Sequence, residues 1–117
     1  MRPPLNGSIV RQLRVTTIQL GYIIASKRVS EDRQPVRYMY RDVPDNGLDS
    51  GWRVFSGTED QAYADVAGNF AMYNASTILE IDPSIGPYLA SPSGTAFERE
   101  DVSGPFQRVP LETPSDA

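Results

Sequence analysis

The chain has 117 residues, of which 39% are hydrophobic, and a formal net charge of −4; this is the size of one domain that can bury a core. It contains no cysteine and no histidine, which excludes disulfides, zinc sites built on these residues, cysteine nucleophiles and histidine-based catalytic triads. No apolar run is long enough for a membrane span, and the start, MRPPLNGS, lacks the apolar segment of a signal peptide, so we expect a cytoplasmic protein without a membrane partner.

The charges are divided unevenly along the chain. Residues 1–41 carry eight Lys and Arg against two acids, a sum of +6, whereas residues 42–117 carry three Arg against thirteen acids, a sum of −10. We favour the interpretation that the two halves attract each other in the fold or that their charges face solvent. The alternative is that the later segments form an acidic surface that steers a basic partner. The overall acidity argues against nucleic acid as a partner.

The first segments predict an arm followed by a strand. Residues 1–14 hold prolines and no periodicity, so we expect a flexible N-terminal arm before the domain. Residues 15–26, VTTIQLGYIIAS, are rich in β-branched side chains, which favour strand, and Gly21 marks a bulge or a break between two strands.

Residues 36–42, VRYMYRD, alternate with period two and predict a half-buried antiparallel strand paired with residues 22–26 in a hairpin. The alternation places Val36, Tyr38 and Tyr40 on the core face and the arginines in solvent. Aromatics interleaved with arginine also occur in proteins that bind single-stranded nucleic acid, but here the two residue types face opposite ways.

The stretch PDNGLDSGWRVFSGTED, residues 44–60, surrounds the only tryptophan with turn-forming residues. Asn46-Gly47 and residues 49–51 predict turns, and GWRVF between them predicts a short strand in which Trp52 and Val54 share a face. A single tryptophan on a short strand is usually a core residue, which we favour, and is otherwise the residue type most typical of an interface anchor.

Two helices are predicted after this strand. Thr58 and Gln61 have capping-box spacing for a helix to about residue 67, with Glu59 and Asp60 in its first turn. That helix is expected to bury Ala62, Tyr63 and Val66.

Thr77 and Glu80 predict a second capped helix, which Pro83 ends, and Asp82 caps a further short turn. Ile85, Tyr88 and Leu89 are expected to pack from that turn.

Residues 95–100 predict a last strand, and residues 102–117 a Pro-rich tail. Strands followed by helices, without βαβ alternation, predict a single α+β domain over residues 15–101: a small antiparallel sheet with two or three short helices packed on one side.

Metal and catalytic motifs are weak. A calcium loop with Gly47 at its sixth position would place Pro44 and Arg53 where acidic ligands are needed, so it is rejected. We favour roles in turns and at a helix start for the acids of residues 44–60. The alternative is a looser Mg²⁺ or Ca²⁺ site formed by Asp45, Asp49, Glu59 and Asp60. No nucleophile elbow or phosphate loop is present, so we predict no catalytic residue, no cofactor and no enzyme.

Four segments, in order, resemble one bacterial family, the immunity protein 33-like family, formerly a domain of unknown function: GYIIASKRV (21–29), the block 44–60, IDP (81–83) and GTAFER (94–99). The resemblance covers about residues 20–100, and the 44–60 block is its most distinctive part. It implies a small non-enzymatic protein that binds and neutralises a cognate toxin of a polymorphic toxin system. The resemblance supplies no catalytic residue.

Our leading hypothesis is therefore a binding protein that occludes the active surface of a protein toxin. An acidic face formed after residue 42 would meet a basic toxin. The alternative is a small-ligand or metal-binding domain that uses the 44–60 loop as its rim, with a pocket beside the tryptophan. The candidate binding residues are Asp45, Asp49, Trp52, Glu59 and Asp60.

Overall fold

The computed structural model describes residues 20–111; the predicted arm at 1–14, the strand residues 15–19 and the end of the tail, 112–117, lie outside the described residues. Within 20–111 the strands are β2 (Tyr22–Ser26), β3 (Tyr38–Arg41), β4 (Asp49–Phe55), β5 (Phe70–Tyr73), β6 (Ala96–Glu98) and β7 (Gln107–Val109). The helices are α2 (Lys27–Ser30), α3 (Gln61–Ala64) and α4 (Ala75–Ile81), joined by two 3₁₀ segments, η1 (Ala67–Asn69) and η2 (Pro83–Tyr88).

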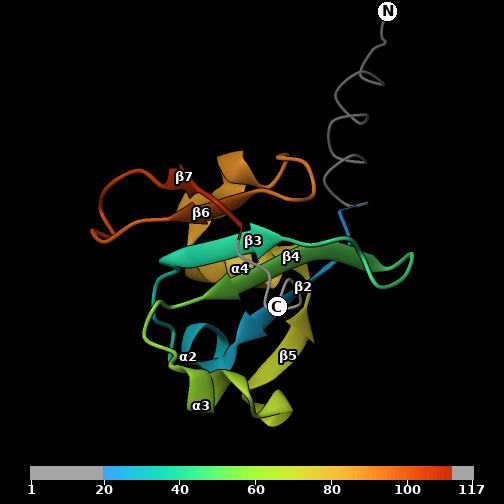
Figure 1. The fold of residues 1–117 in the computed structure, drawn as a ribbon, viewed down its shortest axis with the longest axis horizontal. Coiled ribbons are helices and arrows are strands. Elements are labelled where there is room, and N and C mark those ends of the chain that lie inside the picture. Colours follow the sequence, from blue (N-terminus) through green and yellow to red (C-terminus); the bar gives the residue numbers. More distant parts are fainter. Residues whose placement is uncertain (1–19, 112–117) are drawn as a thin grey trace, which may run out of the picture.

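The described strands form one mixed sheet in the order β5-β2-β4-β3-β6-β7 (Figure 1). β2 and β4 are parallel, and every other neighbouring pair is antiparallel. The α+β class is confirmed, but the sheet is larger than predicted and is not wholly antiparallel. The predicted hairpin between residues 22–26 and 36–42 is wrong, because β4 lies between β2 and β3 and pairs with both.

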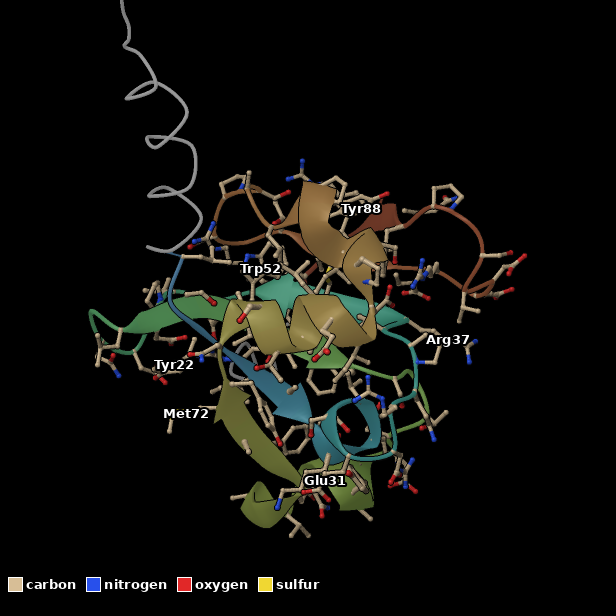
Figure 2. The ribbon with its side chains drawn as sticks, turned by 180° about the vertical axis from the view of Figure 1, so that it is seen from behind. Tyr22, Glu31, Arg37, Trp52, Met72 and Tyr88 are labelled. Carbon is tan, nitrogen blue, oxygen red and sulfur yellow. The ribbon has the colours of Figure 1, made fainter. Side chains whose placement is uncertain are left out.

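The helices α2 and α4 and the segment η2 pack on one face of the sheet, and the core lies between these layers (Figures 1 and 2). Trp52 and Val54 share this face, as predicted, and neither exposes any surface. Buried residues from the helical layer meet them: Val29, Ile78, Ile85 and Leu89.

The two faces of β3 are the reverse of the prediction. Met39 is fully buried, because it pairs with Val54 and shares its core face. Tyr38 and Tyr40 therefore point to the other face of the sheet and are only half-buried. Arg41, expected in solvent, instead donates hydrogen bonds of 2.8 Å to two backbone carbonyls beside the core.

The segment after β4 departs most from the prediction. α3 is a single turn that buries none of its residues, and Val66, expected in the core, is 52% exposed. Without an apolar face to bury, so short a helix gains no tertiary packing to extend it. The chain instead continues through η1 into β5, an edge strand that the sequence pattern did not predict.

The second predicted helix forms, with a shifted start. α4 begins at Ala75, two residues before the predicted cap at Thr77. Asp82 caps η2 as predicted, accepting the N–H of Ser84 at 3.1 Å. Ile85 and Leu89 pack from η2 into the core, as expected.

The sheet continues past residue 101, where we expected the tail to begin. β7 pairs with β6, and the Phe106 ring packs edge-on against Tyr88 with 7% of its surface exposed. No helix within residues 20–111 is both long and apolar enough to cross a membrane.

Candidate functional site

The five candidate binding residues lie at both ends of β4 rather than in one cluster. Asp45 and Asp49 are in the turn before the strand and at its first position, whereas Glu59 and Asp60 follow its last residue. Trp52 lies between them in the buried layer. No group of three or more His, Cys, Asp or Glu in residues 20–111 is arranged to hold a metal ion, so the metal site considered on the four acids does not form.

Asp49 and Arg53 form a buried ion pair. The two carboxylate oxygens accept from Arg53 Nη1 and Nη2 at 2.9 and 2.8 Å, and the Asp49 side chain has no exposed surface. The same carboxylate accepts the N–H groups of Asp45 and Gly51 at 2.8 Å. The hydrogen bonds from Arg53 are the main reason that the pKa of Asp49 lies well below its ordinary value. The Asp49 carboxylate is thus buried and engaged in hydrogen bonds within the protein.

A bulge at Gly51 brings the two residues of this pair closer together. The Cα atoms of residues four apart on a regular strand are separated by roughly 13 Å, and an extra residue in a bulge shortens that distance. The register of β2 against β4 is irregular between Tyr22 and Ile24, and Gly51 adopts φ +90° there. A Cβ on Gly51 would lie against the carbonyl oxygen of Asp42, so only glycine fits this bulge.

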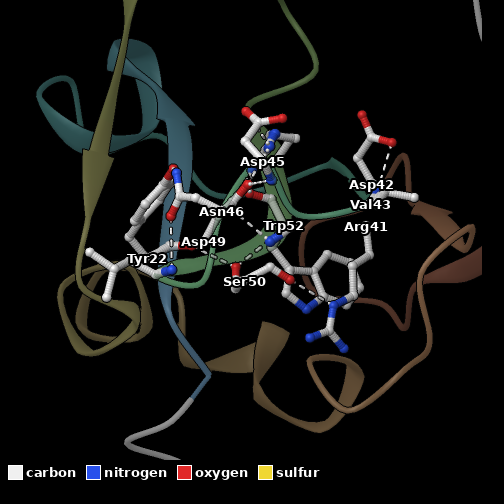
Figure 3. A network of polar contacts seen from close by, with 12 residues as sticks. Tyr22, Arg41, Asp42, Val43, Asp45, Asn46, Asp49, Ser50 and Trp52 are labelled. Atoms are coloured by element: carbon white, nitrogen blue, oxygen red, sulfur yellow. Dashed lines mark hydrogen bonds and ion pairs between the residues drawn. The ribbon is translucent and has the colours of Figure 1, made fainter.

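Polar side chains hold the turn before β4 (Figure 3). Asn46 accepts the N–H of Leu48 at 2.8 Å and donates its amide to the Tyr22 hydroxyl at 3.1 Å. The turn predicted at Asn46-Gly47 is thus confirmed. Asp45 is different from its neighbours, because its side chain is 73% exposed and only 3.6 Å from Arg53. Its carboxylate is the one in this turn region that both reaches solvent and adjoins the ion pair.

Glu59 holds the turn after β4. Its carboxylate accepts the N–H groups of Ser56 and Gly57 at 3.0 Å and the Ser56 hydroxyl at 2.9 Å. Burial on its own would raise the pKa of Glu59, but hydrogen bonds from Ser26 and Ser56 outweigh it and lower the pKa. Ser56 and Glu59 have capping-box spacing, a signal that the sequence analysis passed over in favour of Thr58.

Asp60, rather than Thr58, is the N-cap of α3. Its carboxylate accepts the N–H of Tyr63 at 2.8 Å, and the side chain remains exposed. Arg28 lies over the Tyr63 ring, 4.1 Å from its centre, and donates to the Thr58 carbonyl at 2.7 Å. The prediction that Glu59 and Asp60 lie in the first turn of this helix is wrong, because α3 begins at Gln61 and Asp60 caps it.

Trp52 belongs to the core, the interpretation that we favoured. Its indole N–H donates to the Leu89 carbonyl at 3.0 Å, and its ring stacks with Phe97 at 6.4 Å. The side chain has no exposed surface, so the ligand pocket expected beside it does not open to solvent.

A second buried ion pair was missed by the sequence analysis. Arg99 Nη2 lies 2.8 Å from Asp82 Oδ2, which also accepts the N–H of Val36 at 2.9 Å. Arg99 Nε donates to the Val36 carbonyl at 3.0 Å. The signal was the alternation of residues 95–100, which places Arg99 on the same face as the buried Phe97. This ion pair links the segment before β3, the N-cap of η2 and the residue after β6, so its role is structural.

The helices α2 and α4 cover one face of the sheet (Figure 1). The opposite face carries an aromatic surface. Neighbouring ring centres are 5.7 to 5.9 Å apart, and the rings are half-buried. Met72, on the edge strand β5, is 63% exposed. We call this surface the open face, defined by Tyr38, Tyr40, Phe55, Phe70 and Met72.

A groove lies at one end of the open face, with a volume of about 440 Å³. Aromatic rings from β3 and β4 form part of its wall, and carboxylates from β6 and the Glu59 turn lie around it. We call it the groove, defined by Arg37, Tyr38, Phe55, Gly57, Glu59, Ala64, Glu98, Arg99 and Glu100.

Comparison with known families matches residues 23–110 to the family described as the immunity protein Imm33 domain. Comparisons with curated proteins and with solved structures returned no match. The match runs from the second residue of β2 to just past β7, so it takes in all of the described sheet except Tyr22. The chain therefore belongs to the Imm33 family of immunity protein domains.

Proposed function

We propose that the chain binds a cognate protein toxin and neutralises it by covering its active surface. Membership of an immunity protein family carries this proposal. Occlusion needs binding and no catalysis, which agrees with the structural roles of Asp49 and Glu59, the two carboxylates near β4 with lowered pKa values. We further propose that the complex forms in the cytoplasm, where a chain without cysteine loses nothing to a reducing environment.

The exposed charges of the later segments support a basic partner. In residues 42–111 the one exposed basic side chain is Arg108, against eight exposed acids. Such an excess raises the rate at which an oppositely charged surface is encountered. The eight acids are Asp42, Asp45, Asp60, Asp65, Glu80, Glu98, Glu100 and Asp101.

The first experiment identifies the toxin. The chain is immobilised, lysate of its source organism is passed over it at low salt, and proteins released by raised salt are identified by mass spectrometry. Each candidate is then expressed with and without the chain. Rescue of growth by co-expression supports the proposal, whereas capture without rescue of growth contradicts it.

Charge reversal tests the electrostatic part on the purified toxin. Asp45→Lys with Asp60→Lys changes two exposed acids near β4, and we expect about tenfold slower association at low salt, with little change in dissociation. Glu80→Lys with Glu31→Lys makes the same charge change at exposed positions of α4 and of the chain after α2, away from β4, and should slow association less. Affinity that is independent of salt and of both reversals would refute a steering role for the acids.

A further inference from the structure

We propose that the open face is the surface on which the toxin docks, and that the groove receives an arginine side chain of the toxin. This inference rests on the proposed function and specifies its partner: a basic protein surface that presents a guanidinium group.

The composition of the open face fits a protein interface. Tyr38, Tyr40 and Phe55 form a contiguous ring cluster, and tyrosine and phenylalanine are enriched in the buried centres of interfaces. Tyr40 is half-buried, and its neutral hydroxyl can donate a hydrogen bond across an interface. Met72 extends the surface at the edge strand with an adaptable apolar side chain.

The charges around the groove favour a cation. Arg99 is neutralised by its ion pair with Asp82 and also donates to the carbonyls of Val36 and Gly104. Arg37 is the other cation of the lining, and its Nε is buried without a hydrogen-bond partner in the described structure.

Three acidic residues line the groove together with Arg37. Glu59 keeps its charge, because its hydrogen bonds lower its pKa. Glu98 and Glu100 are exposed, and neither forms an ion pair within the described residues. Three negative charges against Arg37 leave the groove with a net charge of −2, which a cationic side chain of a partner would offset.

The groove walls select arginine among cations. A guanidinium group is planar, stacks on aromatic rings and can bond two carboxylates at once, whereas a lysine ammonium acts as a point charge. Tyr38 and Phe55 supply the rings, and Glu98 and Glu100 supply the acceptors. The fold already uses this contact twice nearby, since Arg28 lies 4.1 Å from the Tyr63 ring centre and Arg99 lies 4.2 Å from that of Phe106.

The first test uses a small probe and needs no toxin. The ¹⁵N-labelled chain is titrated with Nα-acetyl-arginine amide and, in parallel, with the citrulline analogue, which has the same shape without the charge. We expect saturable amide shifts at Tyr38, Phe55, Glu98 and Glu100 with arginine alone. Glu98→Gln with Glu100→Gln should weaken binding about fivefold, whereas Glu80→Gln should have no effect. Equal shifts with citrulline, or no change in the double variant, would overturn the arginine site.

The second test locates the docking surface. Hydrogen exchange is compared between the free chain and its complex with the captured toxin. Slowed exchange at the ends of β3, β4 and β6 supports docking on the open face. Slowed exchange confined to α4 and η2 overturns it while leaving toxin neutralisation intact. Failure to capture or neutralise any toxin would instead remove the proposed function, and the arginine titration would still decide what the groove binds.

Discussion

The buried charge of Arg53 depends on a single carboxylate. Replacing Asp49 by Asn keeps the shape but leaves the guanidinium without a counter-ion, since Asp45 is 3.6 Å away and largely in solvent. We expect the free energy of unfolding at pH 7 to fall by about 3 kcal/mol, as measured by urea denaturation. Asp45→Asn is the control and should change it by less than about 1 kcal/mol. Equal losses in the two variants would show that the pair does not carry the stability.

The same pair sets a pH dependence. The pKa of Asp49 is lowered in the folded state, so its contribution is complete above the ordinary value of 3.8 and is lost as pH falls toward the folded pKa. We expect the unfolding free energy of the wild type to drop steeply below about pH 4. In Asp49→Asn the drop should be shallower, and the part that remains should come largely from Glu59, whose pKa is also lowered. Parallel pH curves for the two proteins would contradict this origin.

Gly51 offers a second residue-level test. Gly51→Ala would force an alanine to adopt φ +90° and press its Cβ against the Asp42 carbonyl oxygen, so we expect a loss of about 3 kcal/mol. Gly47→Ala is the matched control in the neighbouring turn. A Cβ at Gly47 meets nothing within 4 Å, and the change should stay within about 0.5 kcal/mol. The comparison is made by chemical denaturation, and similar values for both would exclude a special role for the bulge.

At the level of elements, β7 and the chain leading to it are part of the fold. Phe106→Ala removes a ring that packs against Tyr88 and lies beneath the Arg99 guanidinium, so we expect a loss of about 3 kcal/mol. Val102→Ala, at a side chain 45% exposed, is the control and should be nearly neutral. If thermal unfolding of both variants matched the wild type, residues after 101 would be dispensable to the core.

Sequence patterns predicted elements where local signals and packing agree. Trp52 and Val54 share one face of a short strand that local alternation predicts. Asp82 precedes a proline, which is favoured at the first position of a helical segment, so its capping role was predictable. The pairing of strands could not be predicted, because the insertion of β4 between β2 and β3 depends on contacts distant in sequence. Local spacing likewise could not show that Asp49 and Arg53 meet, since the bulge at Gly51 that shortens the strand between them is a tertiary feature.

The candidate site shows the same division. Asp45 and Asp60 were correctly assigned to a turn and a helix start, but Asp49, assigned to a turn over residues 49–51, is the first residue of β4. The open face was not visible, because its assignment depends on which side of β3 the helices cover. Alternation defines two faces of a strand, but Met39 and Tyr38 exchange places if the helical layer packs on the other side.

At the level of the whole molecule, one core cluster joins β2, β3, β4 and β6 to the helical layer. Trp52 lies within it and is bonded to Leu89, so its fluorescence should report global unfolding. We expect urea transitions followed by tryptophan fluorescence and by far-ultraviolet circular dichroism to share one midpoint. A fluorescence change at lower urea would reveal that η2 separates before the sheet unfolds.

The parallel pairing of β2 and β4 has a consequence for synthesis on the ribosome. In the sheet, β2 lies between β4 and β5, and both of these strands come later in the chain. The next strand to emerge after β2 is β3, which does not pair with it. At 5–20 residues per second, Phe55 leaves the ribosome roughly 1 to 6 s after Ser26. During that interval both edges of β2 are open to other nascent chains. Slowing synthesis during that interval should therefore lower the yield of soluble protein without altering the finished molecule.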